Sequence, residues 1–361
     1  MRRRLALLSC LCLLASLCLT PLARADYDPL GSGATKLTLD KGFLALLKQN
    51  GVKLSVTAPA KLKGGVVSFP VSGGKFDPVA AKGFVEHGGA LVFSAAGKSV
   101  PIKSPQLKTT SRHSPFTAKV GGSQLKLATA KNLSVTRQGF ADQVTVSSLA
   151  LSAKLATRLG KKLGLRDTFK AGLPLGKSAT RADPVTISLL GRNRVSLTLD
   201  PGFQAKLNSL FVAVNPIFPA EHPGPFTLQI FGGTIAPDAS GGRVETQGSL
   251  EFIQLGGGQI FWAEGALDLT GAAFAPELNL LPSPPYGGKL GVQGVASLSL
   301  AGAARATDAN AQTVTVEGAG LTLSAASAQQ FNEVFAKPQG KSGVFVAGEA
   351  VGSVSFAAQG Q

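Results

Sequence analysis

Val67 to Phe93 reads VSFPVSGGKFDPVAAKGFVEHGGALVF, and Phe226 to Phe252 reads FTLQIFGGTIAPDASGGRVETQGSLEF. The two stretches align without a gap at an offset of 159 residues, and both place a Gly-Gly pair at the same point. Upstream of each, LTLDKGF at Leu37 to Phe43 recurs as LTLDPGF at Leu197 to Phe203. The chain therefore contains one structural unit twice, and each copy serves as a control on motifs found in the other.

The repeat predicts two tandem domains. Its period is far longer than the roughly 20 to 50 residues of solenoids and propellers, and it gives each copy the length of an ordinary domain. The expected order is a leader over residues 1–25, a first domain over 26–182, a linker over 183–192 and a second domain over 193–361.

Each copy is predicted to be mainly β. Short runs that alternate or are rich in β-branched residues, such as 66–71 and 144–146, lie between Gly, Pro, Asn and Ser breakers. With 44 Gly and 21 Pro, the chain is typical of a protein with many turns, and we expect two antiparallel β-sandwich-like domains. Helical patterns near the start and the end of each copy predict one or two short helices, at 43–47, 151–163, 203–210 and 324–335.

The first 25 residues have the form of a secretory signal peptide. A basic start at residues 2–4 precedes a Leu-rich apolar run, and Ala23-Arg24-Ala25 matches the small-x-small cleavage pattern. All three cysteines lie inside this segment, so the mature chain is predicted to have neither a disulfide nor a thiolate site. We expect a secreted, extracellular or cell-envelope protein without a transmembrane anchor.

Charge differs sharply between the copies. Residues 26–190 hold 24 basic and 8 acidic residues, whereas residues 191–361 hold 8 basic and 12 acidic residues. One interpretation is a solvated surface, or attraction between the copies; the other is an anionic partner such as a cell-wall polymer, a membrane surface or a carboxylate-bearing ligand. Nucleic acid is not expected, because the basic residues are not interleaved with aromatic stacking platforms.

No motif predicts an enzyme. The sequence has no GxSxG elbow, HExxH helix or Cys-based site in its mature part. The segment from Gly172 to Ser178 resembles a phosphate loop, but its counterpart beginning at Gly348 keeps the glycines and lacks the lysine. The shared feature is therefore predicted to be a turn before the closing strand.

The stretch from Gly83 to Leu91, GFVEHGGAL, preceded by FPVSGG at 69–74, resembles the HtaA domain. HtaA domains form a family of secreted or surface haem-binding β-domains of actinobacterial haem uptake systems. Later segments at 149–152 and 169–172 also resemble the closing helix and strand of that family. The resemblance covers most of both copies and implies haem as a ligand.

The same resemblance points to candidate haem-binding residues in the first copy. Phe43 matches the phenylalanine of the family's W-G-x-x-x-S-F-x-x-Y run, but no tyrosine follows it. His87 matches the family's histidine, which would then have to ligate iron by itself or with His113. The alternative for His87 is a histidine hydrogen-bonded at a strand end. No metal other than haem iron is expected.

Two functions are left open by the sequence. The first is a ligand-binding protein whose first domain takes haem or another amphipathic anion. The second is a non-catalytic cell-envelope or adhesion module that has kept the scaffold and lost the haem site, since His87 aligns with Thr246 in the second copy.

Overall fold

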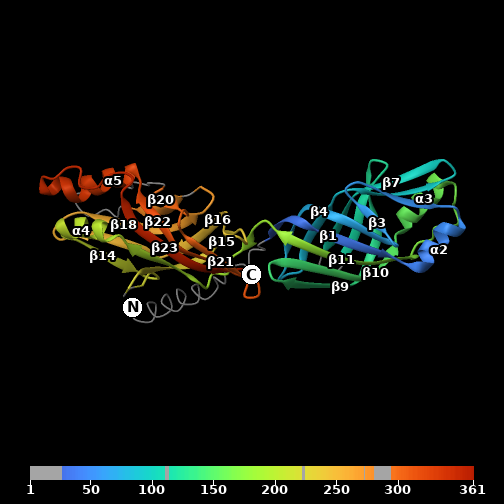
Figure 1. The fold of residues 1–361 in the computed structure, drawn as a ribbon, viewed down its shortest axis with the longest axis horizontal. Coiled ribbons are helices and arrows are strands. Elements are labelled where there is room, and N and C mark those ends of the chain that lie inside the picture. The colour runs from blue at the N-terminus through green and yellow to red at the C-terminus, as the bar shows by residue number, and fades with distance from the viewer. Residues whose placement is uncertain (1–26, 110–113, 222–223, 272, 280–293) are drawn as a thin grey trace, which may run out of the picture.

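The computed structural model describes residues 27–109, 114–221, 224–271, 273–279 and 294–361, and the predicted leader lies outside this part of the chain. Two β-sheets lie end to end along the molecule, one for each copy of the repeat (Figure 1). The mainly β, antiparallel fold class is confirmed. That each copy folds as a separate domain, with a linker over 183–192, stays a prediction.

The first sheet is built by eleven strands between Asp28 and Pro184. They are β1 (Asp28–Leu39), β2 (Lys53–Thr57), β3 (Lys61–Lys63), β4 (Val66–Asp77), β5 (Lys82–His87), β6 (Ala90–Ala95), β7 (Lys98–Thr109), β8 (Ser114–Val120), β9 (Ser123–Gln138), β10 (Ala141–Leu151) and β11 (Pro174–Pro184).

This sheet closes on itself. Its strand order is β2-β6-β7-β5-β4-β1-β11-β10-β9-β8. Strand β8 also pairs with β7, so the eight strands from β7 to β8 in this order form a closed ring. A closed sheet has no free edge along that ring and encloses its own core. β2 and β6 extend from the ring beside β7.

The second sheet follows the same path with strands from Ile187 to Gln359. They are β12 (Ile187–Ser188), β13 (Arg194–Leu199), β14 (Val212–Ile217), β15 (Phe226–Ile235), β16 (Gly242–Gln247), β17 (Ser249–Gln254), β18 (Gln259–Asp268), β19 (Ala273–Asn279), β20 (Ala296–Ser299), β21 (Ala304–Asp308), β22 (Thr313–Leu323) and β23 (Ala350–Gln359). β16 pairs with both β15 and β18 and closes the ring, while β17 and β14 extend from it as β6 and β2 do in the first sheet.

Side-chain caps start the helices where the sequence predicted them. Asp40 accepts from the Phe43 amide before α2 (Lys41–Gln49), and Asp200 accepts from the Phe203 amide before α4 (Pro201–Ser209). Ser152 and Ser324 cap α3 (Ala153–Leu163) and α5 (Ala325–Phe331) in the same way. α5 continues into two further helical turns, η1 (Asn332–Ala336) and η2 (Lys337–Gln339). Within the described ranges no helix is long and apolar enough to cross a membrane.

The repeated glycines mark places where strands approach closely. At Gly176, with φ of +142°, a Cβ would stand 2.0 Å from the Thr38 carbonyl oxygen, and Gly352 shows the same distance to Thr198. Both lie inside closing strands, β11 and β23. The predicted turn before the closing strand is present in both copies, at Gly172 and Gly348, whereas Gly176 and Gly352 allow a backbone contact within the sheet.

Candidate functional site

His87 ends β5 and is buried inside the first ring, with 3% of its surface exposed. Its Nδ1 lies 2.9 Å from the Pro105 carbonyl oxygen, and its Nε2 lies 2.6 Å from Thr35 Oγ1. Thr35 Oγ1 in turn lies 2.7 Å from Thr180 Oγ1. Strands β1, β5, β7 and β11 thus meet in one buried polar chain.

The direction of each hydrogen bond in this buried polar chain follows from the Pro105 carbonyl oxygen at one end of it. A carbonyl oxygen only accepts, so His87 Nδ1 carries the proton and donates to Pro105. The unprotonated Nε2 then accepts from the Thr35 hydroxyl, which leaves Thr180 to donate to Thr35. Burial lowers the pKa of His87 to about 4, against the raising effect of the bond to Pro105, so the ring is neutral at neutral pH.

His87 in this arrangement is not placed to ligate haem iron. Both nitrogens of His87 are hydrogen-bonded, and the nearest cavity has a volume of about 20 Å³ and an apolar lining that includes Phe69, Phe93 and Phe116. Sites for small-molecule ligands and cofactors are typically about 300 to 1,000 Å³. Phe43 is buried on α2 with its ring 6.3 Å from that of Phe93. The third candidate, His113, lies outside the described residues.

The second copy has apolar side chains in place of the two threonines of the polar chain. Val195 and Phe356 pair across β13 and β23 where Thr35 and Thr180 pair across β1 and β11. Thr246, at the position of His87, donates only to the Gly265 carbonyl oxygen, at 3.2 Å. The fold therefore does not require the polar chain.

Six cations lie on β7, β8 and α3 of the first copy, and we call this set the basic face. Its members are Lys98, Lys103, Lys119, Arg158, Lys161 and Lys162. Lys103 and Lys119 are directly opposite each other on β7 and β8, and both are exposed. Like charges at such a position destabilise a sheet.

Helix α3 carries three further members of the basic face, and the sixth, Lys98 on β7, lies near the end of this helix. Lys161 and Lys162 lie in its last turn, and the Lys98 ammonium is 3.4 Å from the place of a Cβ on Gly164, which ends the helix. Arg158 reaches the β8–β9 turn, where its guanidinium lies 2.6 Å from the place of a Cβ on Gly121. Among the described residues none of the six cations forms an ion pair. The basic face therefore presents uncompensated charge to solvent.

A buried charged group joins the two copies. Arg137 on β9 lies 2.6 Å from Asp28 Oδ2, and Asp28 Oδ1 accepts from the amide of Ser188 on β12, at 2.7 Å. Asp142 lies 3.9 Å from Arg137 Nε, and its side chain is 1% exposed. Burial raises the pKa of Asp142 to about 7, although Arg137 acts to lower it. Burial also raises the pKa of Asp28, and the attraction of Arg137 opposes that shift.

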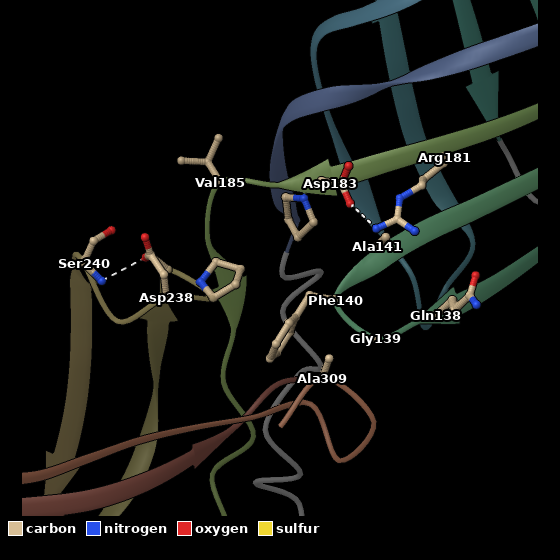
Figure 2. A pocket seen from close by; sticks show the side chains of 13 residues that line it. Gln138, Gly139, Phe140, Ala141, Arg181, Asp183, Val185, Asp238, Ser240 and Ala309 are labelled. Carbon is tan, nitrogen blue, oxygen red and sulfur yellow. Dashed lines mark hydrogen bonds and ion pairs between the residues drawn. The ribbon is translucent and has the colours of Figure 1, made fainter. Parts of the chain in front are cut away.

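A pocket of about 500 Å³ lies at the same junction (Figure 2). Its charged lining residues are already satisfied: Arg181 forms an ion pair with Asp183 at 3.0 Å, and Asp238 accepts from the Ser240 amide at 3.0 Å. Phe140 lines the pocket and packs against the core of the second copy. The charged groups of the pocket are thus engaged by other residues of the protein.

In the described part of the chain, no group of three or more His, Cys, Asp or Glu side chains is placed to hold a metal ion. Of the residues predicted from the sequence, His87 and Phe43 lie near one apolar cavity but do not contact each other's ring. The docking of α3 against β7 and β9 brings Arg158, Lys161 and Lys162 near these strands, a placement that the sequence alone does not show.

Comparison with known proteins finds similarity in solved structures only. No protein-family model and no curated protein matches the chain. The C-terminal domain of HtaA from Corynebacterium glutamicum aligns with 44% of this chain and 98% of that domain, at 12% identity and a TM-score of 0.35. The N-terminal domain of the same protein aligns with 43% of this chain and 98% of that domain, also at 12% identity and a TM-score of 0.35.

A third similar structure is the haem-binding protein HtaB from Corynebacterium glutamicum. It aligns with 44% of this chain and 96% of its own length, at 12% identity and a TM-score of 0.31. Two of these three structures are domains of HtaA, the family that the Gly83 to Leu91 motif resembles, and each alignment spans less than half of this chain.

Proposed function

We propose that this chain is a non-catalytic binding protein of the cell envelope, and that the basic face of its first copy holds an anionic polymer of the wall. One observation carries the proposal: six cations on α3, β7 and β8 have no ion-pair partner in the described part of the chain, and two of them, Lys103 and Lys119, lie directly opposite each other. A surface that only needed to be soluble would not require like charges directly opposite each other.

The placement of Lys103 and Lys119 is the sharpest part of this argument. A polyanion that lies along the pair relieves the repulsion between the two ammonium groups. Part of the binding free energy therefore comes from removing a repulsion that destabilises the free protein. Exposed charges act over a Debye length of about 8 Å at physiological salt. The contact is therefore expected to be strong in dilute buffer and weak at high salt.

The location of the proposed partner follows from the start of the sequence. The predicted signal peptide would export the chain, where anionic wall polymers are abundant and free nucleic acid is not the expected partner. Haem is also an anionic amphiphile. Because both ring nitrogens of His87 are hydrogen-bonded, we propose that haem would contact the basic face through the haem carboxylates rather than bind His87 through its iron.

The proposal is tested by retention of the full mature chain on beads that carry a carboxylated polysaccharide, with neutral dextran beads as the control. We expect retention on the charged beads alone, and a fall of about tenfold or more in affinity between low and high salt. Equal retention on neutral beads would contradict the proposal. Competition by haemin would show that an amphipathic anion shares the surface.

A further inference from the structure

Two large apolar side chains stand side by side in solvent at one end of the second copy. Phe211, just after α4, is 71% exposed, and Leu255, just after β17, is 89% exposed. The Leu255 amide donates to the Phe211 carbonyl oxygen at 3.2 Å, next to the paired residues Val212 and Gln254. We call Phe211 and Leu255 the apolar tip.

The backbone at Phe211 is one that favours glycine. Its φ is +56°, and its amide donates to the Asn208 carbonyl oxygen. The first copy has Gly51 at this position, with φ of +63° and the same bond to Lys48. A bulky side chain in this region is strained, and because the ring is mostly exposed the strain is not offset by burial. Likewise, the exposed Leu255 aligns with the small residue Ala96.

The apolar tip is held in place from beneath. Gln254 is 5% exposed, and its side-chain amide donates to the carbonyl oxygens of Leu210 and Phe335, at 2.9 and 3.0 Å. The first copy has Ala95 at the position of Gln254 and cannot make these bonds. The ends of α4, β17 and η1 are thus tied together directly behind the apolar tip.

Two lysines flank the apolar tip. They belong to the connection between α5 and β23, which is longer than its counterpart in the first copy, residues 336–344 against 164–168. Lys341 donates to the Ser209 carbonyl oxygen at 3.2 Å, and Gln339 donates to the Leu210 carbonyl oxygen at 2.9 Å, which places Lys337 close by. Lys337 and Lys341 are exposed and form no ion pair among the described residues.

The acidic groups nearest in the fold are already engaged. Glu251 on β17 accepts from the side-chain amides of Asn215 and Gln259, and Glu333 on η1 accepts from that of Gln329. Both carboxylates keep their charge but are held by neutral amides, whereas Lys337 and Lys341 beside the apolar tip can meet an anionic headgroup directly.

We propose that the apolar tip inserts into the interface of a lipid bilayer that contains anionic lipid, with Lys337 and Lys341 on the headgroups. Two side chains at a hairpin end are too few for a stable protein interface, which buries about 800 Å² per partner. Apolar side chains rimmed by lysine are the pattern of interfacial membrane contacts. α4 lies toward one end of the long axis of the molecule (Figure 1). This contact lies in the other copy and does not depend on the basic face.

The test uses the full mature chain carrying Lys98→Gln, Lys103→Gln and Lys119→Gln, so that the basic face contributes less to sedimentation with vesicles and all variants are compared in this one background. We expect this protein to bind phosphatidylcholine vesicles that contain phosphatidylglycerol, and Phe211→Gly with Leu255→Ala to weaken that binding by at least about tenfold. Phe211→Gly also restores the residue that its backbone favours, so the fold should be at least as stable to heat. The matched control is Phe231→Ser on β15, another exposed phenylalanine, which should bind as before.

Two further variants separate the parts of the contact. Lys337→Gln with Lys341→Gln should weaken binding to vesicles with phosphatidylglycerol and leave binding to pure phosphatidylcholine unchanged. Phe211→Trp should show quenching by brominated lipid, whereas the buried Trp262 should not. Unchanged vesicle binding by the Phe211→Gly and Leu255→Ala protein would overturn the proposal. So would a dimer in solution that this same variant dissociates, because the occupant would then be a second copy of the chain.

Discussion

Replacing Asp142 with asparagine tests the electrostatics of the junction between the copies. The carboxylate is buried, 3.9 Å from Arg137 Nε, and neither of its oxygens has a hydrogen-bond partner in the structure. Its folded pKa of about 7 lies above the ordinary value of 3.8, so the native state holds this proton more tightly than the unfolded chain does. The free energy of unfolding should therefore fall as the pH rises from about 4 to about 7, and level off above that.

The size of this effect follows from the shift. Each pKa unit corresponds to about 1.4 kcal/mol, so a shift of about three units costs the native state about 4 kcal/mol once Asp142 is ionised. Asparagine has nearly the same shape and cannot ionise. Asp142→Asn should match the wild type at pH 4 and exceed its free energy of unfolding by up to about 4 kcal/mol at pH 8.

The measurement is urea unfolding followed by circular dichroism at several pH values between 4 and 8. Asp183→Asn is the matched control, because Asp183 is partly exposed and pairs with the exposed Arg181, so its effect should be under about 1 kcal/mol. Parallel pH curves for Asp142→Asn and the wild type would refute the reasoning. A variant less stable than the wild type at pH 8 would show that ionised Asp142 stabilises Arg137.

Three further predictions concern the first copy. His87→Ala should lower the free energy of unfolding by about 2 to 4 kcal/mol at pH 7, measured by urea unfolding, because it leaves a cavity and removes the partner of Thr35. Because the pKa of His87 is lowered in the folded state, the free energy of unfolding of the wild type should fall by up to about 3 kcal/mol as the pH falls from 6.5 to 4. The variant should not show this fall. Gly176→Ala should lower the thermal midpoint far more than Gly172→Ala, since a Cβ meets the Thr38 carbonyl oxygen at the first position and open space at the second; equal effects would show that φ alone matters. Haemin titrated at high salt should keep the Soret band of free haemin, and a shift that His87→Ala removes would show instead that the histidine leaves Thr35 to bind iron.

Local structure could be predicted from the sequence because its causes are local. Asp40 and Ser152 cap helices by bonds to amides three residues away, and the spacing of Leu155, Leu159 and Leu163 fixes the buried side of α3. The Gly-Gly pairs of the repeat were correctly aligned, and in both sheets they lie at a register shift where two strands approach closely. The mainly β class followed from the same short-range patterns.

The site could not be predicted because its contacts are distant in sequence. Thr35 meets His87 across 52 residues, and Asp28 meets Arg137 across 109 residues. The pairing of β7 with β8, which closes the ring, cannot be recognised from the composition of either strand. The alignment of Phe211 with Gly51 does place a bulky residue where the other copy has glycine, a difference that is visible in the sequence.

The most direct test of the proposed function compares two variants of equal net charge on carboxylated polysaccharide beads at low salt. One carries Lys98→Gln, Lys103→Gln and Lys119→Gln on the basic face; the other carries Lys61→Gln, Lys82→Gln and Lys177→Gln, three exposed lysines on β3, β5 and β11. At about 0.5 kcal/mol for each exposed contact, the first variant should bind about tenfold more weakly than the wild type and the second less than about twofold more weakly. Equal loss in both variants would mean that overall charge, and not the basic face, holds the polymer, and would contradict the account.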